Sequence, residues 1–543
     1  MTHCIRRLAV GSVAGLVGAL LGAVPASAAP GLHHGPPNFP RGPQVQKAEM
    51  GFFEQWGIYS TPPFDLSSAD DEGEVADLTD LDYAFGGAIP ESGASDNSGS
   101  VLAVPAAPVQ EDPSQPGYNP VVCTSIDAWA DYQTPGAGQV TDTNGNPEPP
   151  VDSPLAGNFE QLALLKEKYP DLKVMMSLGG FNGSAFFSAA ASTPEARKTF
   201  VSSCIKMFIE GDSGYAGGPN SDQGLPITSS SQTPIVPAGT FAGLFNGFDI
   251  DWEYPCGNGV NNGATGNICD YNGANDREDL VLLMQEFRQQ LDALSRTTHQ
   301  RYTLTTEMPA GTQNAVNEDP AGLARYVNDE VVMDYDFQGP WEPTGPTNFD
   351  SNLFTSPDAP TANAEPVISV ASTVQYYESH GVPPSQLVVG MPYYGHGWQG
   401  VPSTGNGLYQ PATGPASVGN GLDEAPGTAD YNEILNYMAS NPSYHWYFDP
   451  WTGSTWVYSA SDNGGTFWSI ENPQEVFEKA LYIDAKGLAG ASMWDLAGDY
   501  DNQLTSALTV GLAQGLQAGF GSPHGPGGPP FGAPGPLGGS PGH

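Results

Sequence analysis

Short apolar runs recur along the chain, and most are separated by segments with helical spacing. Eight of these runs predict strands over 51–59, 81–85, 173–180, 246–253, 301–307, 331–337, 387–394 and 488–496. Amphipathic helices are predicted between them, and one covers 275–295, where apolar residues recur every three to four positions. Buried strands that alternate with helices are typical of a parallel sheet. Eight of them predict the α/β class and a closed (β/α)8 TIM barrel.

Two long segments interrupt this repeat. The connection between the seventh and eighth strands is much longer than a βα unit requires, so residues 399–465 are predicted to form a small α+β insertion domain. The barrel is then formed by 49–398 and 466–513. A polar segment rich in Gly, Pro and Asp is expected over 87–155, as one wall of the site.

The two ends of the chain lack this periodicity. Residues 1–28 are predicted to be an export signal, because Arg6 and Arg7 precede an apolar stretch that ends in the cleavage pattern Ala26-Ser27-Ala28. A membrane anchor is the alternative, but glycines interrupt the apolar stretch. Residues 29–48 are predicted to be a flexible leader rich in Pro and Gly, and 514–543 a disordered Gly/Pro-rich tail.

The charge balance narrows the choice of partners. The chain has 17 Lys plus Arg against 60 Asp plus Glu, a formal net charge of −43. So acidic a surface repels nucleic acid and anionic lipid, and it suits a neutral or cationic substrate. After signal cleavage no further stretch is long and apolar enough to span a bilayer. A secreted, extracellular protein, active as a monomer, is therefore expected.

Export makes disulfide bonds plausible for the four cysteines that remain after signal cleavage. Three pairings are possible. We favour Cys256–Cys269, which closes a Gly- and Asn-rich loop after the fourth strand, and Cys123–Cys204 follows by elimination. A zinc site is the alternative, but the spacings do not match zinc-binding pairs.

The fourth strand carries the strongest chemical signal. Asp249, Asp251 and Glu253 alternate with apolar residues, so all three carboxylates project from one face of the strand. Like charges on a buried face are costly unless they share protons or bind a cation. A solvated acidic edge and a metal site are the alternatives. The flanks offer no further oxygen ligands at loop-like spacing, which favours catalysis over a metal site.

The pattern Asp-x-Asp-x-Glu followed by Tyr254-Pro255 resembles the active-site strand of the family 18 glycoside hydrolases, the chitinase family. Three further motifs resemble the same family: Tyr83-Ala84-Phe85, Ser177-x-Gly179-Gly180 and Met333-x-Tyr335-Asp336-Phe337. Two positions depart from it. Asn246 stands where the family has an Asp, and His396 stands where many members have an Arg.

The resemblance implies a secreted chitinase that hydrolyses β-1,4-linked N-acetylglucosamine polymers with retention, in which the 2-acetamido group of the substrate is the nucleophile. Glu253 would be the acid and base, Asp251 would hold the acetamido nitrogen, and Asp249 would share a proton with Asp251. Tyr335 would donate to the acetamido carbonyl. The substrate would be chitin or chitooligosaccharides, and neither metal nor cofactor would be needed.

Other residues are candidates for binding sugar. The resemblance implies Trp494 as the floor under the reacting sugar and Asp336 beside it. Aromatic rings stack on the flat faces of sugars, and those near predicted strand ends are candidates for subsites, with core packing as the alternative. These candidates are Trp341 and Trp398 first, then Trp56 and Phe181, with Phe85 and Met333 from the motifs.

Two other functions fit the same strand. An endo-β-N-acetylglucosaminidase that cleaves N-glycans uses the same motif, but the insertion and Tyr335 favour a chitinase. A chitin-binding lectin would keep the barrel and the groove, but the retained acid Glu253 argues against it.

Overall fold

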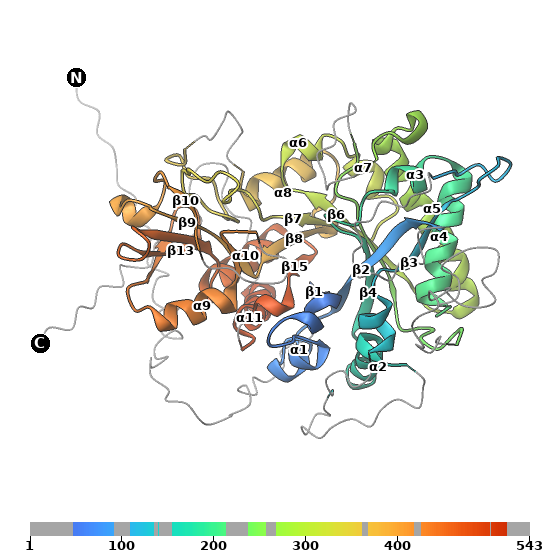
Figure 1. Ribbon diagram of the computed structural model, residues 1–543, viewed down its shortest axis with the longest axis horizontal. Helices are drawn as coiled ribbons and strands as arrows, with labels where there is room; N and C mark the ends of the chain where they lie inside the picture. Colours follow the sequence, from blue (N-terminus) through green and yellow to red (C-terminus); the bar gives the residue numbers. More distant parts are fainter. Residues whose placement is uncertain are drawn as a thin grey trace, which may run out of the picture. The chain divides into compact units, whose positions relative to one another are not determined.

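Eight parallel strands close into a barrel in the computed structural model of the protein (Figure 1). The structure describes residues 47–91, 109–134, 140, 155–212, 237–256, 268–360, 368–417, 425–499 and 501–518. The strands pair in the order β1-β2-β4-β5-β6-β7-β8-β15, and β15 returns to β1. They are β1 (Ala48–Glu54), β2 (Asp80–Pro90), β4 (Lys173–Gly179), β5 (Gly247–Asp251), β6 (Thr303–Pro309), β7 (Asp329–Met333), β8 (Leu387–Pro392) and β15 (Gly490–Trp494). The predicted (β/α)8 barrel is confirmed.

Helices follow the barrel strands and bury their apolar faces against them. In α5 (Asp276–Thr298) the buried positions include Leu280, Leu283, Phe287 and Leu291, as the helical spacing predicted. The other described α-helices outside the insertion are α1 (Leu66–Glu72), α2 (Gly157–Lys168), α3 (Phe187–Ala191), α4 (Pro194–Cys204), α6 (Thr312–Ala315), α7 (Pro320–Leu323), α8 (Val370–Ser379), α10 (Pro473–Lys486) and α11 (Gln503–Ala518).

A second sheet is inserted between β8 and β15, and its strands lie together beside the barrel (Figure 1). It has the order β10-β9-β14-β13-β12, and β11 pairs with β9. Its elements are β9 (Tyr394–Gln399), β10 (Gly414–Pro415), β11 (Thr428–Asp430), α9 (Tyr431–Ser440), β12 (His445–Asp449), β13 (Ser454–Ser459) and β14 (Thr466–Ile470). The sheet thus extends beyond the predicted range 399–465. A single residue, Tyr393, separates β8 from β9, so the sequence reads as one strand across the boundary.

Several element ends differ from the sequence-based predictions. β1 stops at Glu54, and Gln55–Tyr59 forms a 3₁₀ helix. β2 runs to Pro90 and pairs antiparallel with the buried strand β3 (Val121–Ser125), where a polar segment was predicted. Because β3 is only a short strand within a long polar segment, the average composition of residues 87–155 did not indicate it. Helix α11 continues to Ala518, past the predicted start of the tail.

The predicted signal, 1–28, and most of the leader lie outside the described residues. Among the helices that the structure describes, none combines the length and the apolar character needed to cross a bilayer.

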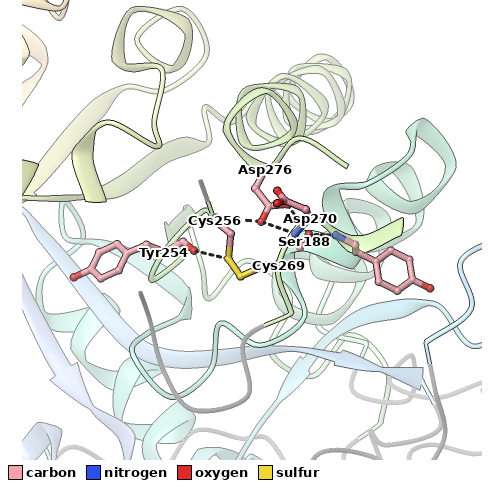
Figure 2. The surroundings of a disulfide bond; sticks show 7 residues. Ser188, Tyr254, Cys256, Cys269, Asp270 and Asp276 are labelled. Atoms are coloured by element: carbon pink, nitrogen blue, oxygen red, sulfur yellow. Dashed lines mark hydrogen bonds between the residues drawn. A yellow bond between two sulfur atoms is a disulfide. The ribbon is translucent and has the colours of Figure 1, made fainter. Parts of the chain in front are cut away.

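Both predicted disulfides are present. Cys123–Cys204 joins β3 to the end of α4, and Cys256–Cys269 closes the loop after β5. Figure 2 shows how the second bond is anchored to α5. Asp276, at the start of α5, accepts hydrogen bonds from the backbone N–H groups of Cys256 at 3.1 Å and Asp270 at 3.3 Å. The segment that follows β5 is therefore tied to the barrel on both sides of the loop.

Candidate active site

Asp249 lies inside the barrel and is completely buried. Its two carboxylate oxygens accept hydrogen bonds from the hydroxyls of Ser177 on β4, at 2.7 Å, and Thr305 on β6, at 2.8 Å. Both partners stand directly opposite Asp249 in the strand register. Burial raises the pKa of Asp249 to about 6, although these hydroxyl donors lower it. Asp249 is thus held rigidly behind the surface of the site.

Asp251 and Glu253 follow on the same face and reach the groove. Burial, and then the charges of Glu253 and Asp249, raise the pKa of Asp251 well above its usual range. Burial also raises the pKa of Glu253 to about 7; a hydrogen bond with Tyr254 lowers it, and the charge of Asp336 raises it. A carboxyl group with a pKa near 7 still carries its proton in weak acid, as a general acid must.

The Ser-x-Gly-Gly motif allows the end of β4 to approach β5 closely. Gly179 has a φ of +115°, and a Cβ there would lie 2.3 Å from the carbonyl oxygen of Asp251. The N–H of Gly180 donates to the same carbonyl at 2.9 Å. Ser184 completes the contact, since its hydroxyl accepts from the backbone N–H of Glu253 at 2.8 Å. These contacts fix the position of the Glu253 backbone just past the end of β5.

Tyr335 and Asp336 are consecutive residues just after β7, and both line the groove. The Oδ1 atom of Asp336 lies 2.8 Å from both the hydroxyl of Tyr394 and Nε2 of His396. The backbone N–H of Asp336 donates to Asp350 at 2.8 Å. Burial lowers the pKa of His396, but the charges of Asp350 and Asp336 and the hydrogen bond to Asp336 outweigh it and raise that pKa. The raised pKa favours the protonated form of His396, which lies between these two carboxylates.

These three side chains, Asp336, Asp350 and His396, form the one group of potential metal ligands within 4.8 Å among the residues that the structure describes. His396 Nε2 already lies 2.8 Å from Asp336 and 3.6 Å from Asp350. The imidazole ring of His396 thus already fills the space between the two carboxylates, and its contacts account for the arrangement.

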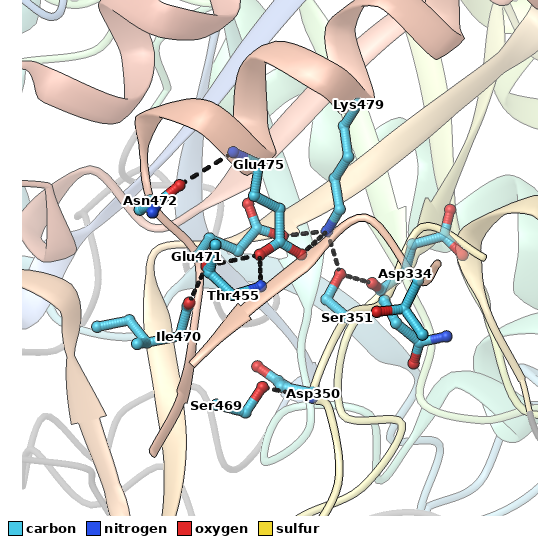
Figure 3. Close-up of polar contacts among 12 residues, drawn as sticks. Asp334, Asp350, Ser351, Thr455, Ser469, Ile470, Glu471, Asn472, Glu475 and Lys479 are labelled. Carbon is cyan, nitrogen blue, oxygen red and sulfur yellow. Dashed lines mark hydrogen bonds and ion pairs between the residues drawn. The ribbon is translucent and has the colours of Figure 1, made fainter. Parts of the chain in front are cut away.

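A buried network of hydrogen bonds holds the segment around Asp350 in place (Figure 3). Its backbone N–H donates to Ser469 of β14 at 2.8 Å. The next residue, Ser351, accepts a hydrogen bond from Lys479 at 2.7 Å and donates to the carbonyl of Asp334. Lys479 of α10 thereby braces the turn that carries Tyr335 and Asp336.

A groove of about 2230 Å³ runs over the C-terminal ends of the barrel strands. Most of the predicted site residues line it, namely Asp251, Glu253, Tyr335, Asp336, Met333, Trp494, Phe85, Trp56, Phe181 and Trp341. Trp494 stacks on Phe85, with ring centroids 5.6 Å apart and an interplanar angle of 19°. Phe181 and Trp341 are the most open of these aromatic rings, 57% and 56% exposed.

Trp398 does not line the groove, and its prediction as a sugar-binding residue is corrected. Its side chain is 1% exposed and packs against Phe467 in the small core of the second sheet. Its indole N–H donates to the carbonyl of Glu342 at 3.0 Å. The alternative of core packing, which the sequence left open, holds at this position.

Asn246 has a structural role in this protein. Its side-chain oxygen accepts hydrogen bonds from the Lys166 ammonium group and from the backbone N–H of Val174 at 3.0 Å. It stands just before β5, at the opposite end from Glu253, and links β5 to β4 and α2. An Asn in place of an Asp at this position therefore does not change the arrangement of Asp249, Asp251 and Glu253.

Some residues of the site were missed in the sequence. Thr305 was not singled out, and Ser177 was named only as part of the Ser-x-Gly-Gly motif, because the apolar pattern does not identify the inward face of their strands. Trp129, 46% exposed, lines the groove from a segment that was read as a polar insertion. Acidic residues also recur along the groove, and no Lys or Arg is among the described residues that line it. The overall charge was the available signal for this last feature.

The fold and the site together define a class: (β/α)8-barrel proteins with a carboxylate cluster at the C-terminal ends of their strands, where barrels of this kind carry their active sites. The comparisons with known proteins identify the family within that class. The model of glycosyl hydrolases family 18 matches residues 49–499, and the chain belongs to this family. The resemblance inferred from the motifs is thus confirmed.

The chain is similar to proteins named chitinases. It is 32% identical to chitinase A1 of Niallia circulans over 370 residues, which cover 67% of this chain and 46% of that protein. It is 28% identical to chitinase C of Streptomyces lividans over 460 residues, which cover 84% of this chain and 58% of that protein. The chain thus spans about half the length of these curated relatives.

Solved structures agree. The catalytic domain of psychrophilic chitinase B from Arthrobacter TAD20 superimposes with a TM-score of 0.67 at 31% identity, covering 87% of this chain and 96% of that domain. Chitinase ChiA74 from Bacillus thuringiensis has a TM-score of 0.64 at 25% identity, covering 87% of this chain and 70% of that one.

Proposed function

We propose that the protein is a secreted chitinase that hydrolyses β-1,4-linked N-acetylglucosamine polymers with retention. The observation that carries the proposal is the arrangement of β5. Asp249 and Asp251 lie on the inward face of β5, Glu253 follows just past its end, and the last two line a groove with aromatic rings. The names of the relatives at 28–32% identity support the same substrate class.

Each carboxyl group has a separate task in this proposal. Glu253, with a pKa of about 7, donates its proton to the glycosidic oxygen and later takes a proton from water. Asp251 accepts from the acetamido N–H and, as an anion, stabilises the cationic ring that the acetamido oxygen forms at the anomeric carbon. Asp249 takes up the proton that it shares with Asp251. Tyr335 donates to the acetamido oxygen.

The groove itself suits a neutral, polymeric sugar. Trp494, stacked on Phe85, forms a flat floor beside Asp251 and Glu253, and Trp341 and Phe181 offer open rings farther along. Because the described lining contains acids but no Lys or Arg, anionic polysaccharides would be repelled. The residues in place supply every step of this mechanism, so we propose that it needs neither metal nor cofactor.

The test is product analysis with the wild type and Glu253→Gln in parallel, on chitin oligosaccharides and on a high-mannose glycoprotein. The exposed Glu278, at the start of α5, offers the matched control Glu278→Gln. We expect mainly disaccharide from chitin and a loss of at least about 100-fold in kcat for Glu253→Gln, since general acid catalysis commonly contributes that much. The control should keep the wild-type rate.

Other outcomes would assign a different function. Cleavage of the glycoprotein alone would identify an endo-β-N-acetylglucosaminidase. Binding of chitin with no product from either substrate would identify a lectin, and an unchanged rate in Glu253→Gln would refute the assignment of the acid.

A further inference from the structure

Two buried carboxyl groups in the barrel interior have no role in the mechanism above. Glu307 on β6 is 4% exposed, and Asp82 on β2 is 1% exposed. All four of their carboxyl oxygens lack a hydrogen-bond partner among the described residues. Burial without a partner is costly for a neutral carboxyl group and far more so for an anion. Such groups persist where they serve a purpose or where they share a proton.

The strand register places Glu307 beside the catalytic carboxylates. Thr305 stands opposite Asp249 and donates its hydroxyl to it inside the barrel. Glu307 is two residues farther along β6, on the same inward face, one level nearer the groove. Asp251 is two residues past Asp249 on β5. The β5–β6 register runs to Ile250 and Thr306, and its continuation by one residue brings Asp251 and Glu307 to one level on strands ~4.8 Å apart.

The two carboxyl groups complement each other. Oδ1 of Asp251 is buried and has no partner among the described residues, whereas both oxygens of Asp249 have hydroxyl donors. A neutral carboxyl group supplies one O–H donor. Glu307 is therefore placed to donate a hydrogen bond to Asp251, as Ser177 and Thr305 do to Asp249.

The surroundings keep Glu307 neutral. The groups that face it are Asp82 from β2, Asp249 and Asp251 from β5, Glu253 just past the end of β5, and Tyr335, which follows β7. Burial first, and then the charges of these carboxylates, raise the pKa of Glu307 well above its usual range. Burial and these charges therefore favour the neutral form of Glu307.

We propose that Glu307 is a positioning residue whose neutral carboxyl donates a hydrogen bond to Oδ1 of Asp251 and holds Asp251 as an anion during the reaction. This inference rests on the proposed function, because it concerns the charge that Asp251 supplies to the intermediate. Asp251 receives that support from a neighbouring strand rather than from the substrate, so it is oriented before the sugar binds.

Two substitutions separate a donor from a space-filling group. Glu307→Gln keeps the shape and a donor but cannot ionise, whereas Glu307→Met has a similar length and no donor. We expect Glu307→Gln to keep kcat within about threefold, and Glu307→Met to lose about 10- to 100-fold in kcat with little change in KM, the range for a hydrogen bond to a charged group.

The pH profile of kcat gives a readout that a structural role would not move. A donor to the ionised form lowers a pKa, so its loss raises the pKa of Asp251. The acidic limb for Glu307→Met should therefore move to higher pH by about one unit, while that for Glu307→Gln stays in place. Equal impairment of both variants, or a wild-type limb for Glu307→Met, would overturn the proposal.

Infrared spectroscopy tests the role of Glu307 independently of activity. If the wild type does not cleave chitin, that result refutes the proposed function, and the spectra still decide whether Glu307 donates to Asp251. The infrared difference spectrum of wild type minus Glu307→Gln near neutral pH should contain the band of a protonated carboxyl group. That band should shift in an Asp251→Asn background, because the acceptor changes. Its absence, or its indifference to Asp251→Asn, would overturn the assignment of Glu307.

Discussion

Replacing Lys479 by Met should strongly destabilise the fold. Lys479 is completely buried in α10, and its ammonium group contacts the carboxylate of Glu471, lies 3.8 Å from that of Glu475 and donates to Ser351 (Figure 3). Both glutamates are also buried, at 3% and 2% exposure. Removing one partner of such a group leaves uncompensated buried charge, which costs about 3–5 kcal/mol. That is a large part of a typical unfolding free energy of about 5–15 kcal/mol.

The magnitude can be checked by urea unfolding followed by tryptophan fluorescence. Lys486→Met is the matched control, because Lys486 lies on the same helix and forms a 3.2 Å pair with Glu378 in which both side chains are partly exposed. Such a surface pair contributes about 0–1 kcal/mol. Adding Glu471→Gln to Lys479→Met should recover part of the loss, since it removes one of the unpaired charges.

The same network determines how the destabilisation by Lys479→Met changes with pH. Without the Lys479 cation the pKa of Glu471 rises, so its protonated form limits the damage in acid, and the destabilisation should grow as the pH increases. The substitution should also lower kcat, because Ser351 would no longer be held against the carbonyl of Asp334, just before Tyr335. A loss below about 1 kcal/mol, or one equal to that of Lys486→Met, would refute the reasoning.

Further outcomes follow from the same structure. Because the pKa of Glu253 is about 7, kcat should fall as the pH rises past that value, which a pH–rate profile on a chitin oligosaccharide will test. Burial raises the pKa of Glu49 to about 8, so the folded state favours the protonated form of this side chain. The protonated Glu49 therefore contributes its full stabilisation in acid, below the pKa of Glu49 in the unfolded chain, and this stabilisation is lost as the pH rises to about 8. Urea unfolding midpoints measured across that pH range will test this. Trp341→Ala should raise KM about tenfold through lost stacking while the unfolding midpoint stays unchanged, whereas Trp398→Ala should cost about 3–5 kcal/mol of stability.

The barrel was predictable because its determinants are local. A parallel strand that is buried on both faces is largely apolar, and short apolar runs of this kind predicted the barrel strands of this chain. The alternation of Asp249, Asp251 and Glu253 likewise fixes a shared face without reference to any other residue. Boundaries were less certain, as at β8 and β9, where one residue separates strands of different sheets.

Contacts between strands were not predictable, since they depend on register. The hydroxyls of Ser177 and Thr305 meet Asp249 because three strands align at one level of the barrel. The same alignment places Glu307 at the level of Asp251, although the two are far apart in sequence.

The sequence by itself determined the barrel, the family and the three carboxylates at the end of β5, because strand periodicity and short motifs are properties of neighbouring residues. Only the tertiary structure decided which aromatic rings face the substrate groove. Trp341 and Trp398 look alike in sequence, yet one is open to the groove and the other fills the core of the second sheet. Burial is decided by what packs against a side chain, and those partners come from segments distant in the chain.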